Sequence, residues 1–188
     1  GRVLACPYSN EKAKLIVREM AETLMFRLTE KKLVTESLTL EIGYDRENVD
    51  NGSYRGQIQT DRYGRTLPKA AHGTVRFDAP TNLGSTIIAE SVKLFARITD
   101  PALTIRRVTL NANKVTPDVG VYQVDFFTDT KKLEREKKLQ QAMLGIKNKY
   151  GKNAVLKGSS FEEGATMRQR NGQIGGHSAG GRAEDGKL

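Results

Sequence analysis

The sequence predicts an α+β fold: a four-stranded, mainly antiparallel sheet with two helices on one face, in the order β-α-β-β-α-β. Residues 38–44 alternate strictly between apolar and polar side chains, which is the period of a half-buried strand. Apolar residues recur at helical spacing between residues 13 and 28. Further strand and helix patterns continue up to about residue 114, in an order that lets both helices cover the same face of one sheet.

The first two elements are a strand and a helix. Residues 3–6 form a short apolar run that Pro7 closes. Ser9 is placed to cap the helix, and Glu11 lies in the first turn, where the helix dipole favours a negative charge. The helical pattern continues to about Leu33.

Residues 45–73 separate the second strand from the third and are rich in Gly, Asp, Asn and Arg. They are too long for a tight turn, so we predict a long loop or a hairpin insertion around residues 61–64. The third strand comes next, at residues 74–78, and residues 80–82 stop it.

The last two elements are the second helix and the fourth strand. Residues 80–82 supply cap residues for this helix, which ends at Asp100-Pro101. The fourth strand runs from Thr104 to about Lys114.

The composition changes near residue 119, which divides the chain in two. We predict a folded domain at residues 1–119 and a C-terminal extension at residues 120–188. The extension contains a basic amphipathic helix within residues 130–150, which either packs on the body or faces DNA or a partner. Residues 158–188 are polar and rich in glycine, with too few large apolar side chains for a core, so we expect a tail that is flexible or ordered by a partner.

The net charge of +9 points to a polyanionic partner, either nucleic acid or an anionic membrane; a merely soluble basic protein is the alternative. No run approaches the roughly 18 apolar residues of a membrane span, so we predict no membrane partner. Cys6 is the only cysteine, which excludes an intrachain disulfide or a cysteine zinc cage.

Motifs for catalysis are absent from the sequence. His72 and His177 lie far apart and lack neighbours at metal-ligand spacing. The chain has no G-x-S-x-G, P-loop or G-x-G-x-x-G motif. We therefore predict no catalytic residue, no metal site and no cofactor in this chain.

One face of the predicted sheet is polar. If Leu38, Leu40 and Ile42 face the helices, strand alternation places the other parity on the opposite face: Thr39, Glu41, Gly43, Thr74, Arg76, Arg107, Thr109, Asn111 and Asn113, with Arg106 and Lys114 beside them. Arg and Lys supply charge for phosphate contacts, and Thr and Asn supply directional hydrogen bonds. An ordinary solvated sheet face is the alternative.

Several segments resemble one family. Residues 90–95 (ESVKLF) and 105–110 (IRRVTL) resemble the second helix and last strand of a little-finger domain, the DNA-gripping domain of Y-family translesion DNA polymerases. Residues 149–154 (KYGKNA) and 170–177 (RNGQIGGH) resemble the C-terminus of the UmuC/ImpB/MucB/SamB branch, especially DNA-repair polymerases of Gram-positive bacteria and their plasmids.

The resemblance implies a role for this chain within a longer protein. The parent polymerase would copy damaged templates in the cytoplasm, at the nucleoid, using Mg²⁺ and dNTPs on a palm domain that precedes residue 1. This part would hold primer–template DNA. The positions that match the family's phosphate grip are Arg106, Arg107 and Thr109, with Arg76 on the neighbouring strand; Asn111 and Lys114 complete the candidate DNA-binding set.

The resemblance also implies a second partner, the bacterial sliding clamp. Residues Gln123, Val124, Asp125, Phe126 and Phe127 are similar to the family's Gln-x-x-apolar-Phe docking peptide, although Val124 and Phe126 stand where Leu is commoner. A short extended segment of this kind inserts apolar anchors into a preformed pocket. The alternative is an edge strand in which Tyr122, Val124 and Phe126 pack on the sheet.

Two other functions fit the same pattern. A four-stranded sheet with two helices also describes RNA-recognition domains, but such a domain needs aromatic side chains on its free face to stack bases. An adaptor protein would bind the clamp and no DNA.

Overall fold

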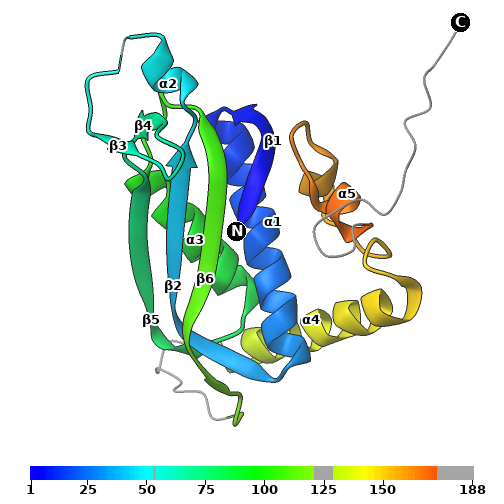
Figure 1. Cartoon of the computed structure of the whole chain (residues 1–188). Helices are drawn as coiled ribbons and strands as arrows, with labels where there is room; N and C mark the ends of the chain where they lie inside the picture. Colours follow the sequence, from blue (N-terminus) through cyan, green and yellow to red (C-terminus); the bar gives the residue numbers. More distant parts are fainter. Residues whose placement is uncertain (53, 121–128, 173–188) are drawn as a thin grey trace, which may run out of the picture.

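The computed structural model describes residues 1–52, 54–120 and 129–172. Its main sheet has the strand order β1-β6-β2-β5, and every neighbouring pair is antiparallel. The strands are β1 (Arg2–Tyr8), β2 (Leu33–Tyr44), β5 (Ala71–Thr81) and β6 (Ile105–Pro117). Figure 1 shows α1 (Asn10–Glu30) and α3 (Gly84–Ile98) together on one face of this sheet. The predicted α+β fold is confirmed.

The core lies between the sheet and these two helices. Leu40, Ile42 and Val108 project from the sheet, and Ile16 and Phe95 meet them from the helices; all five are fully buried. Their spacing on each element is the one expected for a half-buried strand or an amphipathic helix. The apolar alternation therefore fixes which face of the sheet remains free.

Helix α1 begins as predicted, because the Ser9 hydroxyl accepts a hydrogen bond from the Lys12 amide at 3.4 Å. The start of α3 differs from the prediction. Strand β5 continues to Thr81, and the first two amides of α3 donate to side chains of another helix: Gly84 to Gln140 Oε1 at 3.0 Å and Ser85 to Glu136 Oε1 at 2.7 Å. A distant helix thus satisfies backbone donors for which adjacent residues were expected.

That distant helix is α4 (Thr130–Tyr150), which matches the helix predicted within residues 130–150. Gln140 is its buried residue, and the Gln140 amide also donates to Thr29 Oγ1 at 2.6 Å and to the Asn82 carbonyl at 2.8 Å. Leu139 and Ile146 are exposed. Helix α4 is therefore attached to the body through polar contacts of Gln140, Glu136 and Lys137, of which Gln140 is buried.

The insertion at residues 45–73 is a hairpin with a short helix, one of the two predicted alternatives. It contains α2 (Glu47–Asp50), β3 (Ile58–Thr60) and β4 (Thr66–Pro68). Figure 1 shows these elements beyond the end of the sheet where β2 finishes and β6 starts.

The start of the glycine-rich tail differs from the expected flexible segment. Residues 158–172 contain η1 (Gly158–Phe161) and α5 (Met167–Asn171), and they lie against α1. The physical reason is a buried carboxylate, Glu19, which accepts hydrogen bonds from this segment. The division between residues 119 and 120 stays a prediction.

Candidate nucleic-acid interface

The free face of the sheet consists of cross-strand rows that the register defines. Val3, Arg107 and Gly43 form one row, and Thr109, Glu41 and His72 form the next. Arg107 and His72 are exposed. Glu41, near the middle, is an acidic residue on an otherwise neutral or basic surface.

Two further rows complete this face. Asn111, Thr39 and Thr74 form the third row, and Asn113, Ser37 and Arg76 form the fourth. We define the free face as these four rows. The predicted residues Arg76, Arg107, Thr109 and Asn111 all belong to it.

Hydrogen bonds between side chains order the centre of the free face. The Thr39 and Thr74 hydroxyls lie 3.0 Å apart, and the Asn113 amide donates to Thr39 Oγ1 at 2.8 Å. Cross-strand polar contacts of this kind stabilise the pairing modestly. They also hold neutral hydrogen-bonding groups in place between Arg107 at one end and Arg76 at the other.

The two arginines of the free face are available to an anion. In the described part of the chain, no carboxylate lies within 4 Å of either Arg76 or Arg107. Gly43 leaves room beside Arg107, because a Cβ at Gly43 would lie 3.2 Å from Arg107 Cβ. These guanidinium groups can therefore meet phosphates without first breaking an ion pair.

Arg106 and Lys114 lie outside the four rows. The register of β6 shifts between Ile105 and Arg107, and Arg106 Nε lies 3.8 Å from the Asp45 carboxylate. Lys114 has a left-handed backbone, with φ of 50°, and its ammonium lies 3.3 Å from Glu36. Each has an acidic neighbour that reduces its attraction for a phosphate.

Sequence reasoning missed three residues of the free face: Val3, His72 and Ser37. Val3 lies in a predicted strand whose faces were not assigned. His72 was assigned to the insertion, whereas β5 already begins at Ala71. Ser37 precedes the alternating run, whereas β2 begins at Leu33. Continuing the period-2 pattern backwards from the predicted strands at residues 38–44 and 74–78 would have found Ser37 and His72. The clamp-type peptide, residues 123–127, lies outside the described residues.

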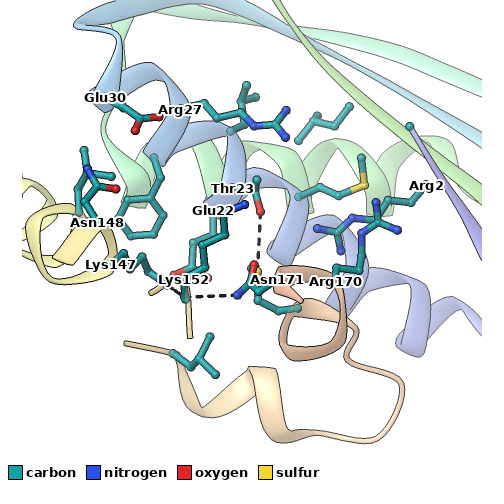
Figure 2. Close-up of a pocket in the computed structure, with 18 residues that line it drawn as sticks. Arg2, Glu22, Thr23, Arg27, Glu30, Lys147, Asn148, Lys152, Arg170 and Asn171 are labelled. Atoms are coloured by element: carbon teal, nitrogen blue, oxygen red, sulfur yellow. Dashed lines mark hydrogen bonds between the residues drawn. The ribbon is translucent and has the colours of Figure 1, made fainter. Parts of the chain in front are cut away.

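A cavity of about 630 Å³ lies on the helix side of the sheet, between α1, α4 and residues 152–171 (Figure 2). Two of its charged side chains, Arg2 and Lys147, make internal contacts. Arg2 donates to Glu19 at 2.8 Å, and Lys147 donates to the carbonyls of Lys152 at 2.9 Å and Val155 at 2.5 Å. Burial lowers the pKa of Arg2, and burial likewise lowers the pKa of Lys147. We interpret this cavity as a gap left where residues 152–171 pack against α1.

Among the described residues, no three His, Cys, Asp or Glu side chains are grouped so that they could hold a metal ion. In the same part of the chain, no helix has both the length and the apolar character of a membrane span.

Comparison with known proteins assigns the chain to a family. The model of the impB/mucB/samB family C-terminal domain matches residues 2–126. The chain belongs to this family. The match covers the whole main sheet with α1 and α3, and it confirms the resemblance to the C-terminal part of Y-family polymerases.

Curated relatives of this impB/mucB/samB domain are repair proteins and polymerases. The putative UV-damage repair protein UvrX of Bacillus subtilis (strain 168) is 26% identical over 168 residues, which are 89% of this chain and 35% of the relative. DNA polymerase IV 2 is 27% identical in Bacillus subtilis and 29% identical in Halalkalibacterium halodurans, each over 110 residues, or 58% of this chain and 26% of the relative. The chain thus spans about a third or less of these proteins.

The match to UvrX is longer than the matches to the two polymerases. The 110-residue matches to the polymerases are shorter than the sheet domain itself. The match to UvrX takes in 168 of 188 residues, so it must extend through α4. Helix α4 therefore lies within the region that aligns with UvrX.

Proposed function

We propose that this domain holds primer–template DNA for a translesion DNA polymerase in the response to DNA damage. The observation that carries the proposal is the free face. Arg76 and Arg107 lie at its two ends, and among the described residues neither has a carboxylate partner within 4 Å. Between them, hydrogen bonds order the side chains of Thr39, Thr74 and Asn113. The family membership and the names of the relatives, a UV-damage repair protein and DNA polymerase IV, support the same class of ligand.

The chemistry of the free face fits the sugar–phosphate backbone better than exposed bases. Its paired residues include no Phe, Tyr or Trp among those the structure describes, so it has no ring on which an RNA-recognition domain would stack bases. Guanidinium groups with Thr and Asn donors suit phosphate oxygens and carry no sequence information. The grip is therefore independent of base sequence.

The catalytic part of this proposal lies in the longer protein. There, Mg²⁺ and dNTPs would serve a polymerase active site, and the domain described here would only bind and orient the duplex. The proposed setting is the cytoplasm, with the enzyme at the nucleoid. We further propose that residues 123–127 dock on the sliding clamp, which would keep the polymerase at the replication site.

The test is the salt dependence of binding to a primer–template duplex. We expect Arg107→Ala to weaken binding to all sequences equally and to reduce the slope of log K against log salt by about one, because one phosphate contact is lost. Arg76→Ala should have the same effect. The measurement is fluorescence anisotropy of a labelled duplex at several salt concentrations.

The matched control is Arg18→Ala, which removes an exposed arginine of α1 on the helix side. This variant should leave the slope unchanged. An equal loss of slope in the Arg18 and Arg107 variants would show that net charge acts rather than the free face. Salt-independent binding, or none at low salt, would contradict the proposed function.

A further inference from the structure

The tip of the β3–β4 hairpin is a closed and defined turn. The Gly64 amide donates to the Asp61 carbonyl at 3.0 Å, and the Asp61 amide donates to the Arg65 carbonyl at 3.0 Å. Gly64 has a φ of 74°, in the left-handed region that glycine adopts without strain. The side chains at the tip are thus presented by a fixed backbone.

The Asp61 carboxylate fastens this turn from within. Its Oδ1 accepts from the amides of Tyr63 at 2.9 Å and Arg65 at 3.0 Å, and its Oδ2 accepts from Arg65 Nε at 2.8 Å. The bond from the Arg65 side chain is the main cause that holds the pKa of Asp61 below its usual range. Asp61 is therefore committed to the turn.

An exposed aromatic ring stands at this tip among cations. Tyr63 is 65% exposed, and the guanidinium carbons of Arg62 and Arg65 lie 4.6 Å and 5.0 Å from its ring centre. In the described part of the chain, Arg55 and Arg62 have no carboxylate within 4 Å. Arg62 also donates a hydrogen bond to the Tyr63 hydroxyl, so cation contacts hold this ring at the surface of the hairpin, where a ligand can reach it.

The tip lies at the end of the sheet near the free face. Asp45 comes directly after β2 there and lies 3.8 Å from Arg106, and its charge also contributes to the raised pKa of Arg65, for which Asp61 is the main cause. Figure 1 shows the hairpin at this end of the sheet. The hairpin therefore lies at the same end of the sheet as the start of β6, which carries Arg106 and Arg107.

We propose that the hairpin tip is a second DNA contact, in which Tyr63 stacks on an unpaired base of single-stranded DNA and Arg62 faces its phosphates. Proteins that bind single strands combine cations along the backbone with aromatic rings that accept any base. Bases within a duplex are already stacked, so a ring of this kind selects the unpaired strand. This inference rests on the proposed function and adds a contact that the free face, without aromatic rings, does not supply.

The sequence contains no tryptophan, so Tyr63→Trp introduces a single fluorescent reporter at the tip. We expect oligo(dT) to quench this tryptophan, and an abasic oligonucleotide of the same length to leave it bright. We also expect Tyr63→Ala to weaken oligo(dT) binding by about tenfold. Phe161→Trp is the matched control, because Phe161 is 63% exposed and the Arg168 guanidinium lies 4.9 Å from its ring.

The outcomes separate this inference from the proposed function. Quenching by oligo(dT) in the Tyr63 reporter, with none in the Phe161 reporter, supports the stacking contact. Equal quenching by the abasic strand, or duplex and oligo(dT) binding with no change at position 63, overturns the inference and leaves backbone binding intact. If anisotropy detects no binding of any DNA, both fail.

Discussion

We expect Glu19→Ala to lower the free energy of unfolding by about 3–5 kcal/mol, because it leaves the buried Arg2 guanidinium without its counter-charge. Glu19 and Arg2 are 4% and 8% exposed, and their side chains meet at 2.8 Å. Glu19 also accepts from the Thr166 amide and hydroxyl, each at 2.8 Å, and from the Met167 amide at 2.7 Å. One carboxylate thus joins β1, α1 and the tail.

Two measurements detect the loss of this carboxylate. Urea unfolding monitored by circular dichroism gives the free energy, and limited proteolysis reports release of residues 158–172. We expect the Glu19→Ala protein to unfold at lower urea and to be cleaved faster within that segment. Cleavage elsewhere in α1 or the sheet should change less.

The matched control is Glu163→Ala, which removes an ion pair to Lys12 at 2.5 Å between the same two parts of the chain. The Glu163 side chain is 86% exposed, and solvent screens its ion pair, so this variant should be far less destabilised than Glu19→Ala. If both variants unfolded at the same urea concentration, the buried Glu19 carboxylate would contribute no more to stability than the exposed ion pair, and the prediction would be wrong.

The double substitution Phe126→Ala, Phe127→Ala should abolish binding to the sliding clamp and leave the melting temperature nearly unchanged. A docking peptide inserts its rings into the partner's pocket, so its loss removes the anchors of binding and no part of the domain's own core. Titration with the clamp measures affinity, and calorimetry measures the melting temperature of the same sample.

The opposite result identifies the alternative structure. If the rings belong to an edge strand packed on the sheet, the double variant should lose about 3–5 kcal/mol per ring and melt much earlier. Phe161→Ala is the control for loss of an exposed phenylalanine, and it should alter neither quantity. Retained clamp binding in the double variant would remove these residues from the proposal.

The sequence by itself determined the order and type of the main elements and the composition of the free face. Hydrophobic period and the Ser9 cap are local properties, so residues 38–44 and the first helix can be assigned without knowing their neighbours. Strand alternation then places Arg76 and Arg107 on the same side of the sheet. Family resemblance in the last strand and the tail led to the same class of ligand.

Only the tertiary structure decided which charges are neutralised. Arg106 and Lys114 have acidic neighbours that a bulge and a left-handed residue bring close, and alternation alone predicts neither. The first backbone amide of α3 donates its hydrogen bond to a side chain of α4. The backbone amides of residues 166 and 167 donate theirs to Glu19, on α1. Gly84 and Gln140 are separated by 56 residues, and Glu19 and Met167 by 148, and local patterns carry no information about such contacts. Residues 158–172 lie folded against α1 because their backbone donors and the Glu19 carboxylate satisfy one another, which is a property of packing rather than of composition.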